Sequence, residues 1–468
     1  MTEEKNRGVL DEYSTKKATL YSLAGFSDVT MFQLFSFLIF TFYFAVVGLN
    51  VNYITIGFII WSIWNAINDP FLGALSDKTG SKWGRRKPFI IAGMYPLLII
   101  NILLWTPPVG DSQFAIFLYF LIIIIVWEFF YTMYSVNQTS LFPEMFRDHT
   151  ERTKANTIVQ SFQLLSLYIA FLLPSFFIPQ YDNPQYFTNY MYAAIAVSII
   201  CGITVTIFIK FSLKERVEFS KDPEQAPSFF KSFKYTFKNK AFRAYVIANF
   251  TIWIAFSMIP TITPLYGSFV LGIKDSLILS LFLVLTFLSA TIFIFIWKPV
   301  VTKLGPKKTY QVVLIVFIIT LIPFMFISDM ISGFIAFFCL GIGIAGTFSV
   351  QNICTSPIID DDELNTGIRR EAGFFGVEGF VVKLSTVVVF IAIALVFNSV
   401  GWAIFDPVGT SEETIFGLRS LMVIFPSICL LIGLISIRYY PFTKEKYEEL
   451  TKAIMKLHES KKEKVLGK

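Results

Sequence analysis

The sequence predicts an all-α membrane protein with twelve transmembrane helices in two six-helix bundles and with both termini in the cytoplasm. Composition is the first observation behind this class, because 55% of the 468 residues are hydrophobic, only 15% are charged and 53 are Phe. Apolar windows of about 20 residues, the length that crosses a bilayer as a helix, also recur along the whole chain. The placement of basic residues is the third observation.

Twelve apolar segments are predicted to be the transmembrane helices. They cover residues 21–47, 53–75, 88–107, 113–140, 156–178, 190–212, 242–266, 276–299, 309–328, 332–354, 373–399 and 416–438.

The basic residues predict how these segments are oriented. All Lys and Arg except Lys274, Lys383 and Arg419 lie in the two tails or in, or at the edges of, alternate loops. Because positive residues are retained on the cytoplasmic side, these loops and both tails are predicted to be cytoplasmic, in a multi-pass protein of the plasma membrane. The net charge of +6 follows from this bias, so it predicts no nucleic-acid partner.

A basic connector with two prolines divides the segments equally. The predicted organisation is an N-terminal bundle at 1–213, the connector at 214–241, a C-terminal bundle at 242–440 and a cytoplasmic tail at 441–468. Apolar residues in the tail, from Tyr447 to Leu457, recur at helical spacing with basic residues opposite. The tail is therefore read either as an amphipathic helix on the anionic inner leaflet or as a solvated segment.

Several function classes lack their usual motifs. The four cysteines lie within predicted segments without metal or disulfide spacing, and both histidines lie outside those segments. No glycine-rich nucleotide loop, zinc motif or Ser/His/Asp arrangement is present. The sequence therefore predicts no enzyme and no cofactor, which leaves transport driven by an ion gradient.

Asp69 is the residue that most directly suggests transport. A carboxylate at membrane depth is costly and is usually retained to move an ion, a proton or a polar solute. Asn65 precedes it by four residues and so shares its helix face, while Pro70 removes a backbone donor and frees carbonyl oxygens that a cation can use.

Loop motifs in both halves resemble a known transporter family. Gly73-x-x-x-Asp77-x-x-Gly80 resembles the cytoplasmic signature of the major facilitator superfamily. Asn68-Asp69-Pro70-x-x-Gly73, followed by Lys82-Trp83-Gly84-Arg85-Arg86-Lys87-Pro88, is similar to the glycoside-pentoside-hexuronide:cation symporters, the relatives of the bacterial melibiose carrier. Pro143-Glu144, Glu151-Arg152-Thr153-Lys154, and the run from Thr366 to Gly376 that leads to Lys383 match the same family.

This resemblance implies the major facilitator fold, alternating access and a cation site in the second helix. The family commonly has an acid where this chain has Asn65, which favours a proton, or no coupling ion, over Na⁺ near Asp69. The expected coupling residues, taken from the resemblance and from the acids and lysine within predicted segments, are Asp69, Asn65, Lys383, Asp28, Glu378 and Glu128.

The charged partners within this set are left as alternatives. Lys383 is expected to pair across the bundles with Asp69, Glu378 or Asp28, because an unpaired ammonium in lipid is unfavourable. Glu378 is five residues from Lys383, a spacing that disfavours a pair on one helix. Asp28 lies one position before the family's sugar-contacting acid, so it either faces the cavity or caps the start of the first helix.

The expected solute contacts depart from the melibiose pattern. The family's span-4 acid falls at Ser135, its stacking Trp at Thr139 and its span-5 Arg at Gln160, which argues against an α-galactoside. Amides, hydroxyls and indole rings remain, and they suit a sugar-like, polyol or nucleoside-like solute. The expected set is Trp61, Trp64, Ser135, Asn137, Gln138, Gln160 and Gln163.

Charged residues at the cytoplasmic ends form a predicted gate. They are Asp77, Arg85, Arg86, Glu144, Arg152, Arg369, Arg370 and Glu371. The predicted partners are a small polar solute, a monovalent cation (H⁺ or Na⁺) and membrane lipid, for a monomer. Two alternatives to a sugar-like solute stay open: an amphiphilic, lysolipid-like cargo, and a receptor or sensor that binds without transporting.

Overall fold

A computed structural model describes residues 14–79, 81, 83–108, 110, 112–146, 149–213, 229–368, 370–408 and 410–465. Within these ranges the regular structure is helical, apart from one isolated bridge between Ser81 and Gly84.

Residues up to 211 form the first group of helices. They are α1 (Thr15–Thr41), continued by the π-helix η2 (Phe42–Val46), then α2 (Val51–Lys78), α3 (Lys87–Leu103), α4 (Gln113–Ser140), α5 (Phe142–Met145), α6 (His149–Ser175), the 3-10 turn η3 (Pro184–Tyr186) and α7 (Phe187–Phe211).

Residues from 229 onward form the second group. They are α8 (Phe229–Lys238), α9 (Lys240–Phe269), α10 (Ser276–Leu321), η6 (Ile322–Met325), α11 (Met330–Thr366), α12 (Glu371–Lys383), α13 (Ser385–Ser399), α14 (Glu412–Arg419), η7 (Ser420–Ile424), α15 (Phe425–Ile437) and α16 (Lys444–Val465).

Local sequence signals explain where several helices begin and end. The side chain of Asn50 accepts a hydrogen bond from Asn52 N and starts α2, and Asp275 and Asp329 start α10 and α11 in the same way. α11 ends at Gly367, whose φ of 75° is left-handed and therefore suits glycine. At Gly305, with φ 72° and ψ 175°, the path of α10 breaks between two predicted segments.

Each of the twelve predicted segments overlaps a helix, but several helices extend beyond the predicted bounds, and α11 continues to Thr366 where the predicted segment ends at 354. Among the described residues, nine helical stretches are long and apolar enough to cross a membrane, one of which spans both sides of the Gly305 break, and α3 is a shorter apolar helix. The all-α membrane class is thus confirmed. The count of twelve crossings and the side on which the termini lie stay predictions.

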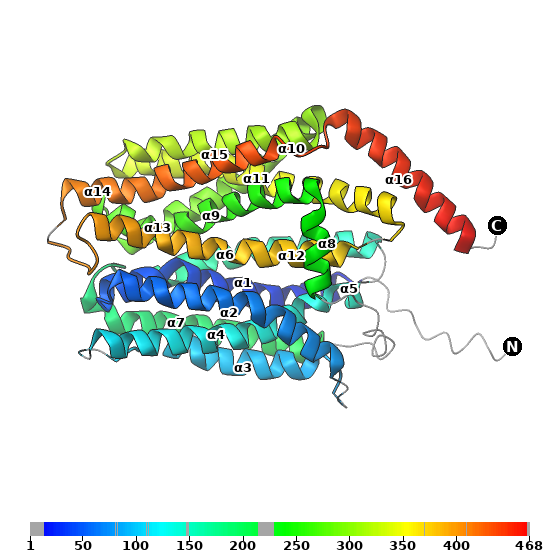
Figure 1. The fold of residues 1–468 in the computed structure, drawn as a ribbon. Helices are drawn as coiled ribbons and strands as arrows, with labels where there is room; N and C mark the ends of the chain where they lie inside the picture. Colours follow the sequence, from blue (N-terminus) through cyan, green and yellow to red (C-terminus); the bar gives the residue numbers. More distant parts are fainter. Residues whose placement is uncertain are drawn as a thin grey trace.

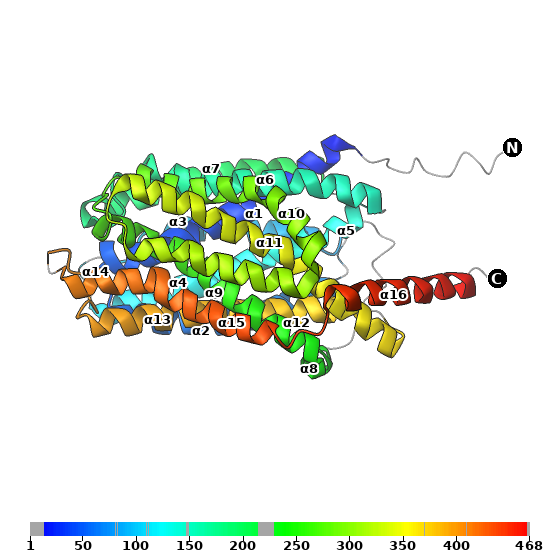
Figure 2. The same cartoon turned by 90° about the horizontal axis from the view of Figure 1, so that it is seen from above.

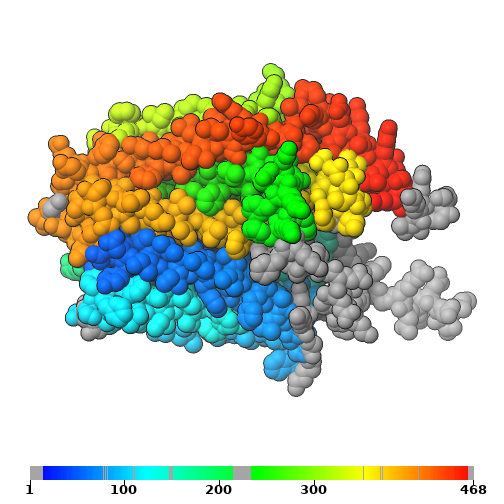
Figure 3. Space-filling model, in the orientation of Figure 1, coloured from blue at the N-terminus to red at the C-terminus, as the bar shows by residue number. Residues whose placement is uncertain are grey.

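The helices form two layers, and the helix axes in both layers are roughly parallel. Figure 1 shows α1 to α4 and α7 in the lower part and α9 to α15 in the upper part, and Figure 3 shows the two sets of residues meeting along a seam. Across the seam α2 packs on α13, α1 on α9 and α6 on α10. Residues 214–228 of the predicted connector lie outside the described residues, and the predicted domain boundaries remain untested.

The two ends of the bundle differ. α8 and α16 lie at one end, called here the α16 end, and α14 lies at the other, called the far end (Figures 1 and 2). α16 contacts α10 and α11, and buries Leu450 and Ile454. The positive-inside distribution predicts that the α16 end is cytoplasmic.

The layers touch closely at the far end. The amides of Asn52 and Asn398 donate to each other at 3.1 and 2.8 Å, and Val51 N donates to Ala403 O at 2.8 Å. Deeper in the seam, Phe58 stacks on Phe390 with ring centroids 3.6 Å apart. Direct contact between the layers therefore closes the far end.

Close backbone approach joins α10 to α11. A Cβ added at Gly341 would lie 2.5 Å from Thr286 O and 2.7 Å from Ala290 N. Because neither backbone atom can move alone, glycine is required for the two helices to approach this closely.

Candidate functional site

Lys383 connects the two layers at the centre of the molecule. It is the last residue of α12, and its Nζ donates to both Asp69 Oδ2 and Asn65 Oδ1 on α2. Asn65 and Asp69 lie one turn apart on the same helix face, which matches the four-residue spacing in the sequence. The ammonium thus lies between a carboxylate oxygen and an amide oxygen of the same helix face.

Two residues of α4 extend this arrangement. Thr132 Oγ1 lies 3.2 Å from Asp69 Oδ1 and 3.0 Å from Glu128 Oε1. A hydroxyl has one proton, so Thr132 donates to one carboxylate at a time. Glu128 is only 1% exposed, and its Oε2 has no hydrogen-bond partner among the described residues. We call Asn65, Asp69, Glu128, Thr132 and Lys383 the coupling cluster.

Open space lies on both sides of the Asp69–Lys383 pair. The central chamber has a volume of about 300 Å³ and the α16-side chamber about 310 Å³. Both are lined by Asp69, Lys383 and Val136. A small aromatic pocket of about 50 Å³ shares Phe32 and Trp61 with the central chamber and includes the Phe58–Phe390 stack. The ion pair therefore faces cavities rather than the outer surface.

The central chamber combines aromatic rings with hydroxyl groups. Besides the coupling cluster, it is lined by Phe32, Trp61, Tyr131, Ser135, Val136, Trp253, Ser257, Val382, Ser385 and Thr386. Trp61 and Ser135 were among the predicted solute contacts. Sequence reasoning missed Trp253, since nothing in its apolar segment distinguishes it from a packing residue.

The other predicted solute contacts do not line these three cavities. Asn137 and Gln138 are buried, and Asn137 Nδ2 donates to Met133 O at 2.8 Å within α4. Trp64 is partly exposed on α2. On α6, Gln160 is exposed and Gln163 is partly exposed. Their roles in solute binding stay predictions.

Asp28 lies in the middle of α1, so it does not cap the start of that helix, where Ser14 is the N-cap residue. It lies close to Ser135 and Tyr131, both of which line the central chamber. Its Oδ1 is buried without a hydrogen-bond partner among the described residues. The structure therefore excludes the cap, whereas Asp28 is not among the residues that line the chambers, and its facing the cavity stays a prediction.

Glu378 lies apart from the coupling cluster. It accepts hydrogen bonds from Tyr245 and Asn249 of α9, and it does not pair with Lys383. Of the three acids considered as partners of Lys383, the structure selects Asp69.

Predicted gate residues of the first layer gather at the α16 end. Arg85 Nη2 and Arg86 Nε donate to the same Glu144 oxygen at 2.8 and 2.9 Å. Arg152 holds the turn after α5 through Phe146 O at 2.9 Å and Pro143 O at 3.2 Å. The side chain of Asp77 lies outside the described residues.

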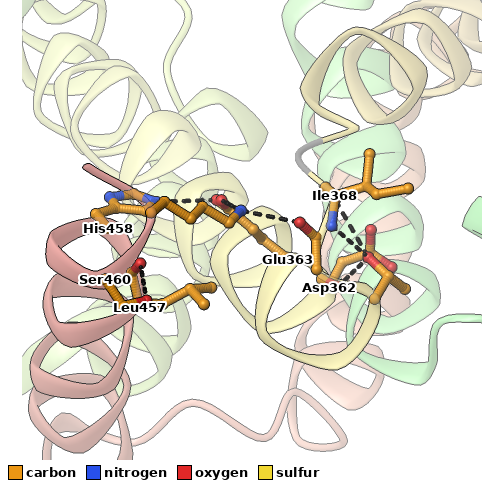
Figure 4. A network of polar contacts seen from close by, with 9 residues as sticks. Asp362, Glu363, Ile368, Leu457, His458 and Ser460 are labelled. Atoms are coloured by element: carbon orange, nitrogen blue, oxygen red, sulfur yellow. Dashed lines mark hydrogen bonds and ion pairs between the residues drawn. The ribbon is translucent and has the colours of Figure 1, made fainter. Parts of the chain in front are cut away.

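A second charged network at this end belongs to the other layer. Arg370 pairs with Asp362, and its guanidinium lies 4.1 Å from the ring centroid of Tyr235. The hydrogen bonds that Arg370 donates to Asp362 raise the pKa of Arg370 above its ordinary value. Glu363 accepts from His458 at 3.1 Å and from Lys461 at 2.6 Å, both on α16 (Figure 4).

The sequence did not single out Asp362 or Glu363, because their partners come from elements that only the fold brings together. Of the other predicted gate residues, Arg369 lies outside the described residues and Glu371 is exposed at the start of α12.

The chain resembles known transporters in both sequence and fold. The model of a family described as MFS/sugar transport protein matches residues 20–444. An uncharacterized symporter of Synechocystis sp. is 22% identical over 479 residues, which cover 84% of this chain and 87% of that protein. The sodium-dependent lysophosphatidylcholine symporter 1 of Gallus gallus is 24% identical over 452 residues, which cover 88% and 84%. The crystal structure of the nucleoside transporter NupG has a TM-score of 0.66 at 14% identity and covers 92% of this chain and 100% of that chain.

Proposed function

We propose that this chain, which belongs to the MFS/sugar transport protein family, couples uptake of a small polar solute to entry of a monovalent cation at the coupling cluster. The chain is a multi-pass integral protein of the plasma membrane and a secondary transporter with the major facilitator fold. The coupling ion, the solute and the residues that bind them are the proposal.

The observation that carries the proposal is the shared position of Lys383. Its ammonium is bound to Asp69 and Asn65, so a proton or Na⁺ that binds Asp69 must compete with it for the same oxygens. Binding of the cation would release Lys383 toward the central chamber, where a solute oxygen can accept its hydrogen bond. Because Asp69 and Lys383 come from opposite layers, the exchange also weakens one contact across the seam.

Whether the cation is a proton or Na⁺ depends on whether Glu128 supplies a second carboxylate beside Asp69. Asn65 cannot supply a charge, but Glu128 lies within reach of Thr132 and so brings a further carboxylate to the cluster. Carboxylate, amide and hydroxyl oxygens suit Na⁺, whereas carboxylates alone suffice for a proton. Imposing a proton gradient or a sodium gradient separately on proteoliposomes distinguishes the two.

The proposed solute is sugar-like or nucleoside-like. Indole rings of Trp61 and Trp253 can stack on a ring, and Ser135, Ser257 and Thr386 can exchange hydrogen bonds with hydroxyl groups. A chamber of about 300 Å³ suits a small solute.

An amphiphilic cargo is the second candidate. The aromatic pocket adjoining the central chamber supports contact with apolar atoms of such a cargo, although its volume of about 50 Å³ accommodates only a few of them. The name of the Gallus gallus relative also describes a lysophosphatidylcholine symporter.

Uptake by purified protein in liposomes tests the proposal. Sugars, nucleosides and lysolipids are screened first by thermal stabilisation at several sodium concentrations and pH values, and then as radiolabelled solutes. We expect accumulation of the stabilising solute against its gradient when a cation gradient is imposed. A ligand that binds without flux would instead support a receptor or sensor.

A further inference from the structure

The second layer contains a polar group that the coupling cluster does not use. Glu378 on α12 faces Tyr245 and Asn249 on α9 and, through them, Gln351 on α11. Tyr245 Oη donates to Glu378 Oε1 at 2.6 Å and Asn249 Nδ2 donates to the same oxygen at 2.8 Å. We call these four residues the Glu378 cluster.

The amide groups of the cluster are arranged as donors toward Glu378. Gln351 Nε2 donates to Asn249 Oδ1 at 3.2 Å, which leaves the Asn249 NH₂ group to face the carboxyl. Two donors of α9 thus meet a single carboxyl oxygen of α12, and one of these donors is oriented by Gln351 of α11. Such an arrangement is more organised than a lone polar residue that merely bonds to its own helix.

Glu378 lacks a counter-cation. No Lys, Arg or His among the described residues lies within ion-pair distance of it, and Lys383, five residues along α12, is bound to Asp69. The titratable groups facing it from α9 and α10 are the phenols Tyr245, which donates to Glu378, and Tyr310, whose hydroxyl has no hydrogen-bond partner among the described residues.

Among the residues whose side chains the structure describes, the other elements packed on α12 bring no cation to Glu378 either. α8 meets α12 through aromatic contacts of Phe233 with Phe380 and of Tyr235 with Phe374, and Arg370 is paired with Asp362. α13 carries no charged residue. On the α2 side the charged pair is Asp69 with Lys383.

The second carboxyl oxygen of Glu378 is available to bind a proton. Glu378 Oε2 is buried and has no hydrogen-bond partner among the described residues. An ionised carboxylate held among membrane helices without a cation is costly, and a proton on the unpartnered oxygen removes that cost. We propose that Glu378 is a second proton-binding site of the carrier, separate from the coupling cluster and contained within the second layer.

Proton binding there would change how α12 is held. A carboxylate accepts stronger hydrogen bonds than a neutral acid, so the ionised form ties α12 more firmly to Tyr245 and Asn249 of α9. α12 also carries Lys383, and its residues Gly376 and Gly379, next to Glu378 in the sequence, line the α16-side chamber. The charge of Glu378 thus changes how firmly α9 holds α12, the helix whose last residue, Lys383, binds Asp69.

Infrared difference spectroscopy of the full chain in liposomes, recorded between acid and alkaline buffer, tests this site without requiring a known solute. Wild type and Asp69→Asn are expected to share a protonated-carboxyl band that Glu378→Gln lacks. Tyr245→Phe should shift this band, because it removes a donor to the carboxyl oxygen. Loss of the band in Glu378→Gln together with its shift in Tyr245→Phe supports the site.

Two results would overturn the site: identical carboxyl bands in wild type and Glu378→Gln, or no change in any band in Tyr245→Phe. The second comparison remains decisive if Glu378→Gln does not fold. Failure of the proposed function is seen separately, since cation-driven accumulation by Asp69→Asn would remove the role of the coupling cluster and leave the Glu378 band unaffected.

Discussion

Replacing Lys383 with Ala removes the one cation that the structure places against Asp69. The side chains of Lys383 and Asp69 are 26% and 35% exposed, so the pair is intermediate between a surface ion pair and a buried one. Surface pairs contribute up to about 1 kcal/mol, whereas breaking a buried pair costs about 3–5 kcal/mol. We therefore expect Lys383→Ala to destabilise the folded protein by about 1–3 kcal/mol.

Thermal unfolding in detergent, followed by tryptophan fluorescence, measures this effect. The double variant Lys383→Ala/Asp69→Asn should recover much of the lost stability, because it no longer carries an unpaired carboxylate. Lys274→Ala, at an exposed lysine outside the predicted segments, is the matched control and should unfold like wild type. Equal stability of Lys383→Ala and wild type, or no recovery in the double variant, would refute the inferred pairing.

The remaining predictions concern other parts of the fold. Cysteines introduced at Asn52 and Asn398 and bridged by a short bifunctional methanethiosulfonate reagent should stop transport until a reductant is added, and full transport with the cross-link in place would show that the far end need not open. Gly341→Ala should lower the free energy of unfolding by about 1–3 kcal/mol because α10 and α11 must separate, whereas Gly376→Ala, with open space around it, should be tolerated in the same melt. Trp253→Ala should raise the solute concentration needed for half-maximal uptake at least several-fold, while an unchanged value would remove Trp253 from the site.

Much of the fold could be predicted because the membrane restricts the possibilities. Backbone groups in lipid must be satisfied within helices, so long apolar segments predict helices directly. The break at Gly305 falls between the predicted segments 276–299 and 309–328. The confirmed family rests on motifs such as Asn68-Asp69-Pro70, whose spacing is a local property of the sequence.

The site could be predicted only where the sequence itself carries the unusual residue. A charge in an apolar segment is conspicuous, which is why Asp69, Lys383 and Glu128 were singled out. Thr132 and Trp253 are ordinary residues in such segments, and only the packing of α4 and α9 around the chamber makes them part of it.

Residues paired across elements were the hardest to predict. Asp362 and Glu363 stand among several acids near the end of α11, and nothing local indicates that Arg370 and α16 contact them. Glu378 was one of three alternative partners of Lys383, although their five-residue spacing disfavoured a pair on one helix, and its side chain faces α9. Sequence spacing specifies the face of a helix, whereas the neighbour of that face depends on the whole bundle.

Two transport assays of the Asp69→Asn variant test the central claim most directly: solute accumulation driven by a cation gradient, and solute exchange without a gradient. The variant should reconstitute into liposomes and exchange solute across the membrane in the absence of any gradient, yet fail to accumulate it when a proton or sodium gradient is imposed. Accumulation at the wild-type level would contradict the claim that Asp69 binds the coupling cation.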